Sequence, residues 1–98
     1  MSIDNGLKYD DNKVRVDLVP PKVILALGEV LTYGAKKYGP DNWQKVDNGL
    51  RRFYGAALRH LLAWADGEIL DPESGLSHLS HALSNLAFMV AIESGKND

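Results

Sequence analysis

Polar side chains at helical spacing in the last third of the 98-residue chain are the strongest indication of chemistry in the sequence. His78, His81 and Asn85 follow one another at intervals of three and four residues, and Asp71 and Ser74 continue the series before them. On a helix that turns 100° per residue, the five positions fall within a sector of about 80°, so all five would face one side. The opposite side would be the buried face of this helix, and it consists of Leu76, Leu79, Leu83, Leu86 and Val90.

Further ionisable groups precede this polar stripe. His60 and Glu68 lie on an earlier apolar segment, and a turn between the two segments would bring them close to Asp71 and to both histidines of the stripe. Carboxylates and imidazoles that converge between helices can hold a divalent cation, activate water or bind phosphate when protonated. A structural interpretation stays open beside this one, in which Asp71 caps a helix, Glu73 is a favourable first-turn charge and the histidines form hydrogen bonds at an interface.

A second group of candidates combines basic and aromatic side chains. Lys36 and Lys37 lie beside glycines and can meet phosphate oxygens, while Trp43, next to Asn42, can stack on a base, a contact that contributes about 1–3 kcal/mol. In the alternative interpretation, the lysines form a solvated helix end and the Trp43 ring closes a hairpin. The arginines that could bind phosphate or lie in water are Arg51, Arg52 and Arg59.

Three helices must position these groups. The first is predicted from Lys22 to a stop near Gly34 or at residues 38–40, the second over residues 50–67, and the third from Asp71, before Pro72, to about residue 94. A turn-rich loop over residues 39–49 joins the first two. Residues 1–19 are predicted to form an extended arm, with the helical core over 20–98. The fold class is therefore an all-α, three-helix hairpin assembly in a single domain of residues 1–98.

The end of the third predicted helix is apolar nearly all round. Its residues 88–92 read Phe-Met-Val-Ala-Ile, which a single small domain cannot easily cover. We therefore expect packing against another subunit, as a homo-oligomeric dimer or tetramer.

Composition excludes several classes of partner. The formal charge of −2 gives no basic field of the kind that holds a nucleic-acid polymer, although a local pocket can still bind a small anion. Cysteine is absent, which excludes thiolate metal sites. The first residues are polar and no apolar run approaches about 18 residues, so no signal peptide and no membrane partner are expected, and the protein is predicted to be cytoplasmic.

Three separated motifs carry a family resemblance. They read KYDDNKVRVDLVPP at residues 8–21, VLTYGAKKYGPDNWQK at 30–45 and RHLLAWADGEILDPESGLSHLSHALSN at 59–85. In this order they resemble the phage-associated dATP/dGTP diphosphohydrolase domain, which is related to the MazG-like all-α NTP pyrophosphohydrolases. The resemblance covers residues 8 to about 90, and it implies an oligomeric MazG-like helical bundle in the host cytoplasm if the protein is phage-encoded.

The activity that this resemblance implies is cleavage of a purine (deoxy)nucleoside triphosphate to monophosphate and pyrophosphate. In the wider superfamily, acidic residues from two helices hold Mg²⁺ or Mn²⁺, but here residues 59–63 and 81–85 carry imidazole and amide where those carboxylates are expected. The acids that remain are Glu29, Glu68, Asp71 and Glu73. Of these, Glu68 and Asp71 together with bound phosphate could hold the metal. The resemblance assigns His60, His78 and His81 to catalysis, and it assigns nucleotide binding to Lys36, Lys37, Asn42, Trp43, Arg59 and Asn85.

Two other functions stay open. The scarcity of clear metal carboxylates favours a module that binds or sequesters a nucleotide or nucleotide signal without cleaving it. The polar stripe would also suit a helical interaction protein, in which it merely satisfies an interface. Metal-dependent consumption of the nucleotide, binding with the nucleotide recovered intact, and no effect of nucleotide on the melting temperature distinguish the three.

Overall fold

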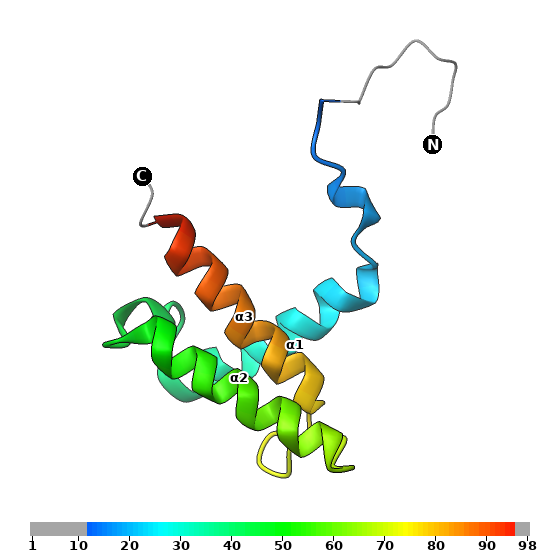
Figure 1. The fold of residues 1–98 in the computed structure, drawn as a ribbon, viewed down its shortest axis with the longest axis vertical. Coiled ribbons are helices and arrows are strands. Elements are labelled where there is room, and N and C mark those ends of the chain that lie inside the picture. Colours follow the sequence, from blue (N-terminus) through cyan, green and yellow to red (C-terminus); the bar gives the residue numbers. More distant parts are fainter. Residues whose placement is uncertain (1–11, 96–98) are drawn as a thin grey trace.

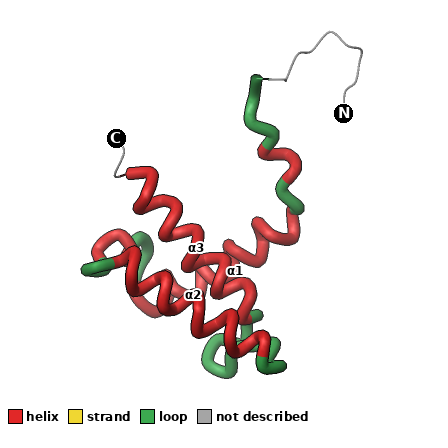
Figure 2. The backbone as a smooth tube through the Cα atoms, viewed as in Figure 1, coloured by secondary structure: helices red, strands yellow, loops and turns green. Residues whose placement is uncertain are grey.

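The computed structural model describes residues 12–95. Within them lie three α-helices, α1 (Pro21–Tyr38), α2 (Gly49–Ala65) and α3 (His78–Gly95), and two short 3-10 helices, η1 (Val16–Leu18) and η2 (Asn42–Lys45) (Figures 1 and 2). Over this range the backbone forms no strand, only an isolated bridge between Leu70 and Ser77. The predicted all-α class with three helices is confirmed.

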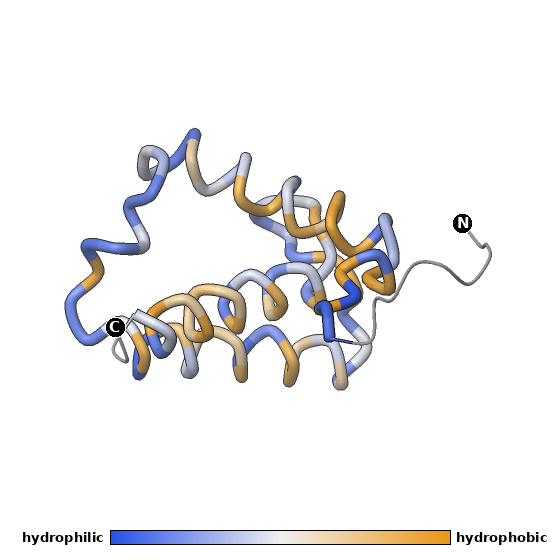
Figure 3. Tube along the Cα trace, turned by 90° about the horizontal axis from the view of Figure 1, so that it is seen from above, coloured by the Kyte–Doolittle hydropathy of each residue, from blue (hydrophilic) through white to orange (hydrophobic). Residues whose placement is uncertain are grey.

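The helices α2 and α3 form an antiparallel hairpin, and the C-terminal part of α1 packs against α3 (Figure 1). All three helices carry hydrophobic residues, whereas the loop between α1 and α2 is largely hydrophilic (Figure 3). Because three elements meet near the middle of α3, the polar side chains at the start of this helix face both α1 and α2.

The bounds of α1 and α2 agree with their predictions to within two residues. Pro20 and Pro21 start α1, since proline at a first helical position loses no hydrogen bond there. The helix ends at Gly39, whose φ of 89° lies in a region that side chains rarely adopt. Of the two predicted stops for this helix, the later one is confirmed.

The predicted start of α3 at Asp71 is wrong, because this helix begins at His78. Residues 69–78 instead fold back on themselves, with backbone hydrogen bonds from Asp71 N–H to the Leu76 carbonyl (2.8 Å) and from His78 N–H to the Ile69 carbonyl (2.9 Å). The turn needs Gly75 at a φ of 75°, which interrupts any helix through this segment. The Ser77 hydroxyl accepts the N–H of Leu79 (3.1 Å), as an N-cap residue does.

The predicted buried face of α3 is also wrong within the single chain. Leu79, Leu86 and Val90 are 42%, 46% and 60% exposed, whereas His78 and Asn85 are buried. The stripe faces inward because its polar groups find hydrogen-bond partners between the helices, so that the leucines point out. On α2 most of the large apolar side chains are likewise exposed, whereas Ala57 is buried.

The apolar end of α3 partly packs within its own chain. The rings of Phe88 and Trp43 stack with centroids 5.0 Å apart, and Phe53 lies against Phe88 at the same separation. The Ile92 side chain approaches Gly49, at the start of α2. Val90 remains exposed, so only part of this segment is available to another subunit.

The predicted N-terminal arm lies partly outside the described residues, which begin at residue 12. Residues 12–20 are exposed and contain the short 3-10 helix η1. None of the helices in residues 12–95 has the length and apolar character needed to cross a membrane.

Candidate functional site

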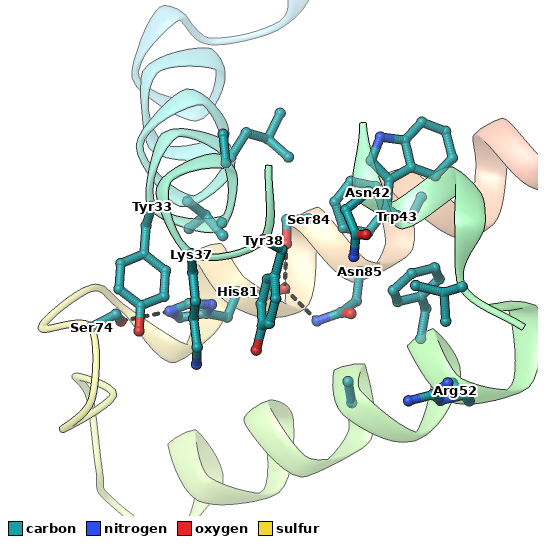
Figure 4. A pocket seen from close by; sticks show the side chains of 18 of the residues that line it. Tyr33, Lys37, Tyr38, Asn42, Trp43, Arg52, Ser74, His81, Ser84 and Asn85 are labelled. Atoms are coloured by element: carbon teal, nitrogen blue, oxygen red, sulfur yellow. Dashed lines mark hydrogen bonds between the residues drawn. The ribbon is translucent and has the colours of Figure 1, made fainter. Parts of the chain in front are cut away.

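A pocket of about 900 Å³ lies between the three helices (Figure 4). Small-molecule sites commonly measure about 300–1,000 Å³, so a nucleotide fits within this volume. In Figure 4 one side of the pocket carries Tyr33, Lys37, Ser74 and His81, and the other side carries Trp43 with Asn42. The pocket therefore has an ionisable end and an aromatic end.

The ionisable end is organised by the turn that contains Asp71. The Oδ1 atom of Asp71 accepts hydrogen bonds from the backbone N–H groups of Glu73 (2.7 Å) and Ser74 (3.3 Å). Glu73 in turn accepts a hydrogen bond from the Tyr33 hydroxyl (2.6 Å) and forms an ion pair with Lys37. These contacts with α1 fix the turn, and they leave the second oxygen of Asp71 directed towards His60, 3.8 Å from its Nδ1.

Three histidines meet beside this turn. The Nδ1 atoms of His60 and His78 lie 2.8 Å apart, and the rings of His60 and His81 stack with centroids 4.6 Å apart. The other ring nitrogen of His78, Nε2, lies 2.8 Å from Glu68 Oε1. Because a carboxylate accepts hydrogen bonds, His78 Nε2 carries a proton. Neutral His78 therefore directs a bare Nδ1 at His60.

Electrostatics favours neutral imidazoles in the pocket wall. Burial lowers the pKa of His60, and the neighbouring histidines lower it further. Burial likewise lowers the pKa of His81, whose Nε2 is 2.7 Å from the Ser74 hydroxyl. Partial burial raises the pKa of Asp71, but the hydrogen bonds from the Glu73 and Ser74 N–H groups outweigh it, so that the pKa is lowered overall. Around neutral pH the site thus offers a carboxylate and unprotonated imidazoles.

Basic side chains of α2 line the same pocket. Arg52 and Arg59 are seven residues apart, about two helical turns, and therefore lie on one side of the helix. Between them Gly55 and Ala56 present almost no side chain, and an Nη1 atom of Arg59 lies 3.5 Å from the position that a Cβ at Gly55 would occupy. Within residues 12–95 no carboxylate forms an ion pair with either guanidinium group. We define these four residues as the arginine strip.

Gly55 provides a test of this strip. Alanine at position 55 makes only an ordinary contact with Arg59, and it favours the helix by about 0.5–1 kcal/mol. We expect Gly55→Ala to raise the melting temperature by about 2–8 °C in thermal unfolding followed by circular dichroism. Gly55→Leu should fill the strip and weaken nucleotide binding. Equal nucleotide affinity of the leucine variant would show that the strip is not used.

The aromatic end joins η2 to α3. One face of Trp43 is covered by Phe88, so the ring partly closes the loop, as one of the two interpretations of the sequence expected. Asn85 is buried and donates from Nδ2 to the His81 carbonyl (2.9 Å), and the Ser84 hydroxyl donates to the same carbonyl (3.1 Å). Trp43, Asn42 and Asn85 all line the pocket and could contact a base there.

The structure brings most of the predicted site residues together. Eight line the pocket: Lys37, Asn42, Trp43, Arg59, His60, Asp71, His81 and Asn85. His78 lies behind the pocket wall and contacts His60, and Glu68 contacts His78 from the far side. Lys36, in the last turn of α1, does not line the pocket. Sequence reasoning missed Tyr33, which its spacing of four residues from Lys37 on one helix could have indicated.

Fold and site together define an all-α domain whose interhelical pocket combines imidazoles, a carboxylate and guanidinium groups. The chain belongs to the family described as dATP/dGTP diphosphohydrolase, N-terminal, whose model matches residues 4–98. It is 36% identical over 84 residues to a dATP/dGTP diphosphohydrolase of Salmonella phage PMBT28. The match covers 86% of this chain and 28% of the phage protein, so the chain spans less than a third of that relative's length. No solved structure matches the chain.

Proposed function

We propose that this protein hydrolyses purine (deoxy)nucleoside triphosphates to monophosphate and pyrophosphate with the help of a divalent ion. The observation that carries the proposal is the arginine strip, which has no carboxylate partner among residues 12–95 and leads along α2 to His60 in a pocket of nucleotide size. Guanidinium groups bind phosphate oxygens through two parallel hydrogen bonds. The family description and the name of the phage relative support the same activity.

The shape of the pocket orients the substrate. The base would lie at the aromatic end, against Trp43 and near Asn42 and Asn85, whose amides can hydrogen-bond to a purine edge. The phosphates would then follow the arginine strip. The bond between the α- and β-phosphates would then lie near His60 and Asp71.

The residues at the ionisable end fit a divalent ion. His60, Asp71 and His78 each offer a donor atom, and these atoms lie within 4.8 Å of one another. The sequence favours Mn²⁺ or Mg²⁺ by family resemblance, and imidazole with carboxylate suits Mn²⁺ better. Such an ion, when bound, neutralises phosphate charge and makes water more acidic.

The imidazoles in the wall can take up the proton of the reaction. Water attacks the α-phosphorus, the bond from this phosphorus to the bridging oxygen breaks, and pyrophosphate leaves with the bonding electron pair. The neutral imidazole of His81 accepts the proton that the water loses, because burial keeps the pKa of this histidine below the ordinary value, whereas His60 would hold the ion. Arg59 would balance the charge on the phosphates as the bond breaks.

An incubation with separated products tests the proposed function. Purified protein is mixed with each (deoxy)nucleoside triphosphate in Mn²⁺, Mg²⁺ or chelator, and the products are resolved by ion-exchange chromatography. Monophosphate and pyrophosphate should appear from dATP and dGTP only with metal. Recovery of all nucleotides intact, together with a nucleotide-dependent rise in melting temperature, would instead establish a binding protein.

We propose further that a second copy of the chain covers the exposed apolar faces. The first half of α1 extends away from the hairpin (Figure 1), and Ile24 and Leu25 on it are 58% and 68% exposed. Only Val30, Ala57 and Ala82 form the buried apolar core of the described residues, which is little for a chain of this size. We expect sedimentation equilibrium to give a dimer or tetramer. A monomer at micromolar concentration would contradict this.

A further inference from the structure

We infer that His60, Asp71 and His78 form a centre for a first-row transition ion, and that this centre discriminates against Mg²⁺. The inference rests on the proposed function for the use of the ion. The binding itself follows from the donor atoms and can be measured without a nucleotide.

The donor set determines which ions fit. Two imidazole nitrogens and one carboxylate oxygen meet at this place, which is the one group of at least three such donors within residues 12–95. Imidazole is a good ligand for Zn²⁺, Fe²⁺, Co²⁺ and Ni²⁺, whereas Mg²⁺ is held by oxygen atoms and keeps several waters. The single carboxylate offers Mg²⁺ too few of the oxygen ligands that this ion prefers, and the two imidazole nitrogens do not replace them.

The distances are already close to those of a coordinated ion. Two nitrogens bound to one ion at about 2.1 Å each lie about 3.0 Å apart in octahedral geometry and about 3.4 Å apart in tetrahedral geometry. The Nδ1 atoms of His60 and His78 lie 2.8 Å apart, and His60 Nδ1 lies 3.8 Å from Asp71 Oδ2. Small shifts of the rings therefore suffice to admit an ion. Without an ion, the two nitrogens must share a proton.

A second and independent observation is the contact behind His78. This side chain is 5% exposed, and its Nε2 donates to Glu68, which leaves Nδ1 unprotonated and aimed at His60. A carboxylate that fixes the ring and tautomer of a histidine in this way is the usual support of a metal-bound imidazole. Glu68, named as a metal ligand from the sequence, would thus be a positioning residue.

The centre is open on one side. His60 and Asp71 line the pocket, whereas His78 lies behind them. An ion held by these three groups would therefore face the pocket with its remaining positions free. Catalytic ions commonly have three protein ligands and such free positions, whereas structural ions are enclosed by four.

Equilibrium dialysis of the full chain without nucleotide tests the inference, with Zn²⁺, Co²⁺, Mn²⁺ and Mg²⁺ as probes and the visible absorption of Co²⁺ as a second readout. We expect one ion per chain, affinity rising from Mn²⁺ through Co²⁺ to Zn²⁺, and Mg²⁺ binding at least about 100-fold more weakly than Zn²⁺. His78→Ala should abolish the Co²⁺ spectrum. Glu68→Gln should weaken Zn²⁺ about 10–100-fold. Asp66→Asn and Glu29→Gln change exposed carboxylates that do not belong to the donor group, so these variants serve as matched controls and should bind as the parent does.

Two results would overturn the inference. One is Mg²⁺ affinity equal to that of Zn²⁺, and the other is a loss in His81→Ala as large as in His78→Ala, since His81 is not in the donor group. If His78→Ala fails to fold, Glu68→Gln and Asp71→Asn preserve the shapes of the side chains and decide the question. Ion binding without turnover would count against the hydrolase, whereas absence of ion binding counts against this centre.

Discussion

Asp71→Asn should lower the rate of nucleotide hydrolysis at least about 100-fold while the fold persists. Loss of a group that only supports a metal ligand typically costs about 10–100-fold, and loss of a ligand itself should cost at least as much. The variant retains an Oδ1 atom that can accept the N–H groups of Glu73 and Ser74, so the turn before α3 is preserved. It replaces the charged oxygen that faces His60 by an amide NH₂ group, whose nitrogen cannot bind a cation. Steady-state kinetics with dATP and dGTP measures the loss.

Two controls make this result specific. Asp66→Asn removes a carboxylate from the exposed end of α2 and should leave the rate unchanged. The melting temperature of Asp71→Asn should lie within about 3 °C of the parent, since its backbone contacts remain. Full activity of Asp71→Asn would reduce this residue to a turn-forming role, a structural role in place of the helix cap that the structural interpretation of the sequence assigned to it.

Arg59→Ala should lower kcat/KM about 10–150-fold, because a hydrogen bond to a charged group contributes about 1.5–3 kcal/mol. The guanidinium group lies over Gly55 in the pocket, next to His60 in the sequence, and has no ion-pair partner within residues 12–95. A rise in KM with unchanged kcat would indicate that Arg59 binds phosphate equally in the ground state and the transition state. Equal losses in kcat and kcat/KM would indicate a contact made in the transition state.

Lys45→Ala is the matched control for Arg59→Ala. Lys45 is an exposed basic residue at the end of η2, outside the pocket, so its loss changes the net charge equally. If both variants lose activity to the same extent, the arginine contributes through general electrostatic attraction rather than by contact. Arg59→Lys should recover only part of the activity, because an ammonium group cannot offer two parallel hydrogen bonds.

The helices could be predicted from the sequence because their signals are local. Two prolines before α1 and Gly39 after it fix its ends within the chain segment itself. The start of α3 was missed because Asp71 before Pro72 looks like a helix cap, whereas backbone pairing across residues 69–78 decides the outcome. That pairing joins residues on both sides of the turn, and a helical spacing rule does not contain it.

The sequence predicts which side chains gather around the pocket, but not that the polar face of α3 is the buried one. The stripe from Asp71 to Asn85 was recognised by spacing, yet an apolar face opposite a polar face is ordinarily buried. Here the buried side is the polar one, because His78 and His81 find partners in Glu68 and Ser74. Such partners become visible only when two helices are placed side by side.

The donor atoms proposed for the ion all come from residues 60–78, within one hairpin, whereas α1 supplies the opposite wall of the pocket. Contacts this close in sequence form early when a chain folds, because little chain must be ordered to make them. Docking of α1 onto the turn, through Tyr33 and Glu73, closes a much longer loop. An ion would therefore protect backbone amides of α2 and α3 from hydrogen exchange, whereas a nucleotide that touches all three helices would extend that protection to α1.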